Sequence, residues 1–132
     1  MKYFTIAELC KSTTAEKAGI DNRCKKEHVA NLTLLVDNVL DPLREAYGKP
    51  IHINSGFRCS ALNKKIGGVS TSDHLKGMAA DITGGSPVEN RRLFNLIQEL
   101  KLPFKQLIDE KHFEWVHVSY DQDNLKRQIL AL

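Results

Sequence analysis

Ser72-Asp73-His74-Leu75-Lys76-Gly77-Met78-Ala79-Ala80-Asp81 is the stretch of this 132-residue sequence around which the fold is organised. It predicts a loop that runs into a central strand, Ala79 to Thr83. His74 and Asp81 are seven positions apart, with small residues between them. If His74 lies on the loop and Asp81 on the strand, both side chains can converge on one ion. Imidazole nitrogens and carboxylate oxygens are ordinary zinc ligands.

Helices are predicted both before and after this strand in the sequence. The capping-box spacing from Thr5 to Glu8 starts a short helix near Thr5. Apolar residues recur every three or four positions over 27–47, which predicts an amphipathic helix that Pro42 kinks or divides. Residues 60–65 form a brief helix, and Ser86-Pro87-Val88-Glu89 begins a longer one.

Three further strands are predicted, at 51–54, 104–108 and 115–119, and a short helix at 124–130 ends the chain. Helices around a small central antiparallel sheet indicate the α+β class. The length fits one domain spanning residues 1–132.

The segment His112-Phe113-Glu114-Trp115-Val116-His117-Val118-Ser119 offers a third ligand. Alternate side chains of a strand share a face, so Trp115, His117 and Ser119 point the same way. His117 can then join His74 and Asp81, and three protein ligands leave the fourth position of a tetrahedral zinc site for water. Glu114 lies at the start of this strand, where its carboxylate can take a proton from that water.

These motifs resemble a known family. S-x-H-x-x-G-x-A-x-D at 72–81 and E-x-x-H at 114–117 resemble the zinc D-Ala-D-Ala carboxypeptidase family of bacterial cell-wall peptidases, peptidase family M15. Ser55-Gly56-Phe57-Arg58 with Asn63 resembles its S-G-[FY]-R-x(4)-N segment. The F-T-x-x-E-L start resembles the small branch common in phage lysins. The resemblance spans nearly the whole chain and implies a hedgehog/DD-peptidase-like fold.

The resemblance also implies residue roles. It implies one zinc ion per chain, held by His74, Asp81 and His117, with Glu114 as general base. It implies that Arg58 binds the substrate carboxylate or the polarised carbonyl, and that His112 stabilises the transition state. Ser72 either touches the substrate or orients the loop that carries His74.

A zinc metallopeptidase that cuts peptidoglycan is therefore the expected function. The bond lies in the stem peptide or its cross-link, so D-Ala-D-Ala carboxypeptidase and L-Ala-D-Glu-type endopeptidase activities are both open, and an endolysin role is expected. The alternative is a non-catalytic, zinc-stabilised module that binds cell wall or belongs to a virion. Complete retention of Glu114, Arg58 and His112 favours the enzyme.

Charge and composition narrow the partners. The net charge is +3, but no run of Lys or Arg exceeds two residues, so no nucleic-acid partner is expected. No segment has transmembrane length, and the N-terminus lacks the apolar core of a signal peptide. We therefore expect a monomer made in the cytoplasm, with no membrane partner, that reaches the cell wall by release or delivery.

The three cysteines, Cys10, Cys24 and Cys59, form no C-x-x-C pair. Their odd number fits a reducing compartment and small packing residues without chemistry. One disulfide with one free thiol is the alternative.

Overall fold

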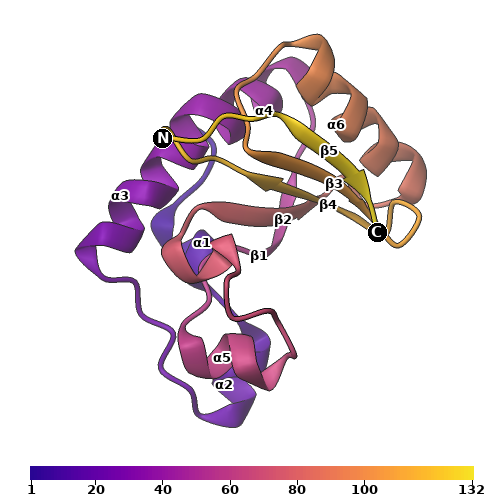
Figure 1. Ribbon diagram of the computed structural model, residues 1–132. Coiled ribbons are helices and arrows are strands. Elements are labelled where there is room, and N and C mark those ends of the chain that lie inside the picture. The colour runs from indigo at the N-terminus through magenta and orange to yellow at the C-terminus, as the bar shows by residue number, and fades with distance from the viewer.

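A five-stranded sheet forms the centre of the computed structural model, which describes residues 1–132 (Figure 1). The strand order is β1-β2-β4-β3-β5. Every neighbouring pair is antiparallel except β3 and β5, which are parallel. The strands are β1 His52–Ser55, β2 Ala79–Thr83, β3 Gln106–Glu110, β4 Trp115–Ser119 and β5 Gln128–Ala131. The predicted α+β class with a mainly antiparallel sheet is confirmed.

The C-terminal segment is a strand, so the predicted helix at 124–130 is wrong. Strand β5 pairs with β3 from Gln106↔Gln128 to Asp109↔Ala131. Arg127, immediately before it, has φ of 54°, which a right-handed helix does not contain. A helix of about seven residues has little stability of its own. The unpaired edge of β3 offers the same segment a row of backbone hydrogen bonds, and these decide its conformation.

Helices cover one face of the sheet (Figure 1). Helix α6, Pro87–Glu99, packs against β2, β3 and β4, and Ser86 caps it by accepting a hydrogen bond from the Glu89 amide. The predicted helix at 27–47 is α3 (Lys26–Leu35), the π-helical segment η1 (Val36–Leu40) and α4 (Asp41–Tyr47). The predicted interruption therefore takes the form of a π-helical segment just before Pro42, whose missing N–H and ring disturb the preceding turn.

Successive side chains along the strands point alternately to the two faces of the sheet, so one set forms the core and the other faces the metal site. The side chains that face the helices are fully buried: Ala80, Ile82, Leu107, Val116 and Val118. The intervening residues Asp81 and His117 therefore point to the opposite face, which the long helices leave open. The buried apolar residues form one contiguous cluster against these helices.

Short elements complete the fold, with α2 and α5 at the lower end of Figure 1. Helix α1, Ile6–Cys10, is capped by Thr5 as predicted, and α5, Ser60–Lys65, lies where it was expected. Helix α2, Thr13–Ala18, was not predicted; the Ser12 hydroxyl caps it and left-handed Gly19 ends it. The 3-10 turn η2, Asp73–Lys76, precedes β2. No helix has both the length and the apolar character needed to cross a membrane.

A disulfide joins Cys10, at the end of α1, to Cys24, just before α3. The alternative of one disulfide and one free thiol is therefore the correct one, and the interpretation without cysteine chemistry is wrong. The free Cys59 is half-buried, and its sulfur caps α5 by accepting from the Leu62 amide.

Candidate metal centre

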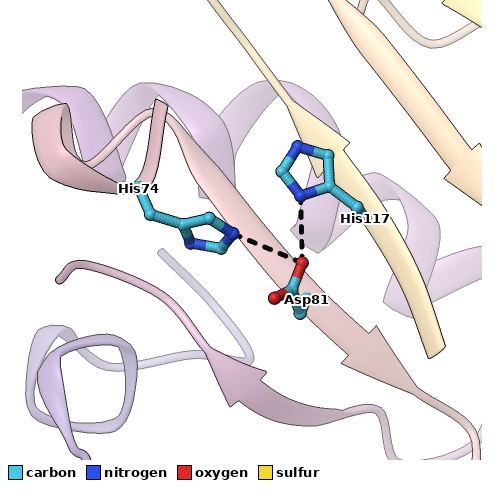
Figure 2. Close-up of side chains that lie close together, drawn as sticks. All are labelled: His74, Asp81 and His117. Carbon is cyan, nitrogen blue, oxygen red and sulfur yellow. Dashed lines mark hydrogen bonds and ion pairs between the residues drawn. The ribbon is translucent and has the colours of Figure 1, made fainter. Parts of the chain in front are cut away.

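Three side chains from two strands and one loop meet on the open face of the sheet (Figure 2). Asp81 and His117 are direct cross-strand partners on β2 and β4, and His74 reaches them from η2. His74 Nε2 lies 3.3 Å from Asp81 Oδ1, and His117 Nδ1 lies 3.0 Å from the same oxygen. One ligand atom from each residue lies within 4.8 Å of the other two. The structure thus brings together the three predicted ligands.

These separations fit a zinc ion. Ligand atoms about 2.1 Å from a tetrahedral ion stand roughly 3.4 Å from one another. The two contacts to Asp81, 3.3 Å and 3.0 Å, are close to that value. Two imidazoles and one carboxylate are also the ligand set of a catalytic site, which keeps one position open.

The hydrogen bond of His74 to the backbone prepares its other nitrogen for a metal. Its Nδ1 lies 2.7 Å from the carbonyl oxygen of Gly56. A carbonyl only accepts, so Nδ1 carries the proton and donates, which leaves a lone pair on Nε2. That Nε2 is buried and has no hydrogen-bond partner. A buried nitrogen lone pair without a donor fits a metal ligand.

Asp81 stays ionised in this setting. Burial opposes its charge, but the hydrogen bond from His117 and the nearby imidazole of His74 outweigh burial and hold the pKa of Asp81 below its usual range. An ionised carboxylate between two imidazoles supplies negative charge where a cation would bind.

The triad lies in the wall of a cavity of about 780 Å³. Three side-chain atoms of the whole chain are buried without a hydrogen-bond partner: Arg58 Nε, His74 Nε2 and Trp115 Nε1. All three residues line this cavity. Buried polar atoms are almost always paired, so their concentration here indicates a polar ligand.

Arg58 reaches the site as predicted. Its Nη2 is 3.8 Å from Asp81 Oδ2, and its Nη1 donates to Asn63 Oδ1 at 3.3 Å. Asn63 is buried and also donates to the Val69 carbonyl, so it fixes the guanidinium. Burial lowers the pKa of Arg58, and the charge of Asp81 partly offsets that. The Arg58 amide donates to the His74 carbonyl at 3.0 Å, which joins the two motifs directly.

Ser72 and Gly77 shape the loop around His74. The Ser72 hydroxyl accepts from the His74 amide at 3.2 Å, and Ser72 also lines the cavity. Gly77 has φ of +75°, and a Cβ there would lie 2.8 Å from the His28 carbonyl oxygen. The absence of a side chain at Gly77 therefore gives room to α3.

Two predicted catalytic residues lie elsewhere. His112 and Glu114 are exposed in the loop between β3 and β4, and neither lines the cavity. Glu114 lies one residue before β4 and three before His117, and strand residues an odd number of positions apart point to opposite faces. Glu110, at the end of β3, does line the cavity. Sequence reasoning missed it because the predicted strand ended at 108, whereas continued alternation would have put Gln106, Ile108 and Glu110 on one face.

The sequence as a whole matches a family model. The model for peptidase M15 matches residues 2–119. The chain belongs to the peptidase M15 family. This M15 peptidase is also 37% identical over 84 residues to the zinc D-Ala-D-Ala carboxypeptidase of Streptomyces albus G. That match covers 63% of this chain and 32% of the Streptomyces protein, so the chain matches about a third of that relative's length. The predicted family resemblance is confirmed.

Proposed function

We propose that this M15 peptidase holds one zinc ion with His74, Asp81 and His117 and hydrolyses a peptide bond of the peptidoglycan stem peptide or cross-link. The convergence of three donor atoms within 4.8 Å, in a cavity wall, carries the proposal. Family membership and the similarity to a zinc D-Ala-D-Ala carboxypeptidase support the same metal and substrate class.

Zinc bound here would polarise the scissile carbonyl and lower the pKa of water to about 7. The chain's own residues orient the reactants. The Gly56 carbonyl fixes the His74 ring, and Asn63 fixes Arg58. Arg58 keeps a buried Nε–H without a partner, so it can hold a substrate carboxylate or the developing oxyanion.

The cavity favours a short acidic peptide. Its volume of about 780 Å³ lies in the range of small-ligand sites, which suits a few residues of an extended peptide. Arg58 and Lys126 line it as cations, Lys105 is paired with Asp73, and a bound zinc ion would offset the charges of Asp81 and Glu110. Peptidoglycan stem peptides carry free carboxylates, so this charge supports them as substrates.

Digestion of purified peptidoglycan tests the proposal. Zinc-loaded wild type, the His117→Ala variant and the control His52→Ala are each incubated with several wall types, and the products are identified by mass spectrometry. His52 is an exposed residue of β1 outside the cavity that holds the triad. Metal analysis should give one zinc per wild-type and His52→Ala chain and much less for His117→Ala.

The products of digestion identify the reaction that is catalysed. Stems shortened by a terminal alanine identify a carboxypeptidase, and separated stems or cross-links identify an endopeptidase. Wild type and His52→Ala should give the same fragments and His117→Ala none. Absence of fragments from every wall type, with one zinc bound per chain, would refute catalysis and leave a wall-binding or virion structural module.

A further inference from the structure

One carboxylate in the cavity wall has no partner of its own. Three acidic residues line the cavity: Asp73, Asp81 and Glu110. Asp73 pairs with Lys105 at 3.0 Å, and Asp81 lies between the two histidines. Burial and the charges of neighbouring groups act on the Glu110 carboxylate, but no side-chain hydrogen bond does. We propose that Glu110, not Glu114, is the general base of this peptidase, an assignment that rests on the proposed function.

The sheet register places Glu110 beside the triad. Across the open face, Asp81 is paired with His117, and His117 with Ile108. Glu110, two residues after Ile108, is paired with Trp115, two residues before His117. Glu110 and His117 are thus diagonal neighbours on one face, about 7 Å apart at their Cβ atoms. A glutamate side chain spans much of that distance, so its carboxylate can reach a water held beside the triad.

Glu110 is close to the triad without belonging to it. The cluster of donor atoms within 4.8 Å comprises His74, Asp81 and His117 only. A carboxylate outside this cluster leaves the fourth metal position open, and a general base needs to touch the attacking water, not the metal. Glu110 therefore has the placement that was predicted for Glu114.

Glu114 is held on the other side of the hairpin. Its amide donates to the Glu110 carbonyl at 3.0 Å, and its own carbonyl accepts from Asn90 Nδ2 at 3.0 Å. Asn90 belongs to α6, on the helix-covered face. These two bonds fix the Glu114 backbone, and its side chain is exposed.

The surroundings of Glu110 suit a group that takes and returns a proton. Burial raises the pKa of Glu110, and the negative charge of Asp81 raises it further, while His117 and Lys111 act in the opposite direction. A carboxylate whose pKa lies closer to neutrality holds a proton more readily between two steps.

The proposed step conserves atoms and protons. Glu110 takes one proton from the attacking water as the water oxygen bonds to the scissile carbonyl carbon. The C–N bond then breaks, and Glu110 gives that proton to the leaving amine. The products are a carboxylic acid and an amine, and Glu110 is again a carboxylate.

Paired variants test the assignment. Glu110→Gln and Glu114→Gln make the same isosteric change four positions apart on one hairpin. Glu110→Gln should lower kcat by about 100-fold or more, the usual contribution of a general base. Glu114→Gln should stay within about threefold of wild type, as for an exposed residue. Both should bind one zinc per chain and melt near the wild-type temperature.

A second readout does not depend on turnover. Visible absorption of the cobalt-substituted proteins, followed against pH, reports ionisation next to the metal. Its midpoint should shift in Glu110→Gln and remain unchanged in Glu114→Gln. A loss confined to Glu114→Gln, an equal loss in both variants, or an unshifted midpoint in Glu110→Gln would overturn the assignment. Wild type that binds zinc and cuts nothing would instead refute the proposed function.

Discussion

Gly56 connects the metal site to the N-terminal helix, and replacing it by alanine should damage both. A Cβ at Gly56 would lie 2.2 Å from the carbonyl oxygen of Leu9 and 3.0 Å from its carbonyl carbon. The same Leu9 oxygen accepts from the Phe57 amide at 2.8 Å, and the Gly56 carbonyl accepts from His74. The added methyl group must therefore push α1 away from the turn that orients His74.

The magnitude follows from these contacts. Gly56 has no positive φ, so the cost of alanine is steric. Overpacking costs about 1–3 kcal/mol, and loss of the Phe57–Leu9 hydrogen bond adds about 1 kcal/mol. An unfolding entropy of about 2.1 cal/mol/K per residue then converts roughly 2–4 kcal/mol into a Tm lower by about 7–14 °C. Zinc affinity should fall by about 10- to 100-fold, as when the outer partner of a ligand is lost.

Thermal unfolding of the zinc-free protein and zinc titration against a competing chelator measure both effects. Gly48→Ala is the control, because Gly48 has φ of +73° and open space around its Cβ position. That control should lower the free energy of unfolding by about 1 kcal/mol and leave zinc affinity unchanged. A Gly56→Ala protein that melts within about 2 °C of wild type and binds zinc equally well would refute the reasoning.

Three further outcomes are expected. The pKa of Asp81 is lowered on folding, so its contribution to stability is fully present above the unfolded value of 3.8 and lost as pH falls through the lower folded value. Urea unfolding of the zinc-free protein should show this loss below about pH 4, and Asp81→Asn should flatten it. Asn90→Ala should lower the free energy of unfolding by about 2–4 kcal/mol in thermal unfolding, because the buried Asn90 side chain accepts a hydrogen bond from the Gly84 amide and donates to two carbonyls of the β3–β4 loop. A decrease of less than about 1 kcal/mol would contradict this. His112→Ala should keep peptidase activity within about threefold, whereas a tenfold loss would show that His112 reaches the substrate.

The parts of the site that sequence predicted are those set by local spacing. The spacing of His74 and Asp81 along one loop and strand, and alternation along the strand of His117, predict the face on which each lies, and the pairing of β2 with β4 then brings them together. The capping residues Thr5 and Ser86 likewise marked helix starts, because a side-chain cap is a local interaction.

The parts that sequence missed depend on contacts between distant segments. Whether 128–131 becomes strand or helix depends on the free edge of β3, about twenty residues earlier. The Cys10–Cys24 pairing depends on where α1 and the start of α3 pack. The pattern E-x-x-H pointed to Glu114, and only the hairpin register shows that Glu110 shares the face of His117.

Two of the three metal ligands lie on β2 and β4, which have a neighbouring strand on each side. Internal strands are the last parts of a sheet to open, so amide exchange there should be slow. Lys126 also lines the cavity, but it lies outside the strands and outside the loop that carries His74. Metal retention and choice of peptide are therefore separable properties. If the proposed function holds, substitutions at Lys126 should change which peptides are cut while the zinc site stays intact.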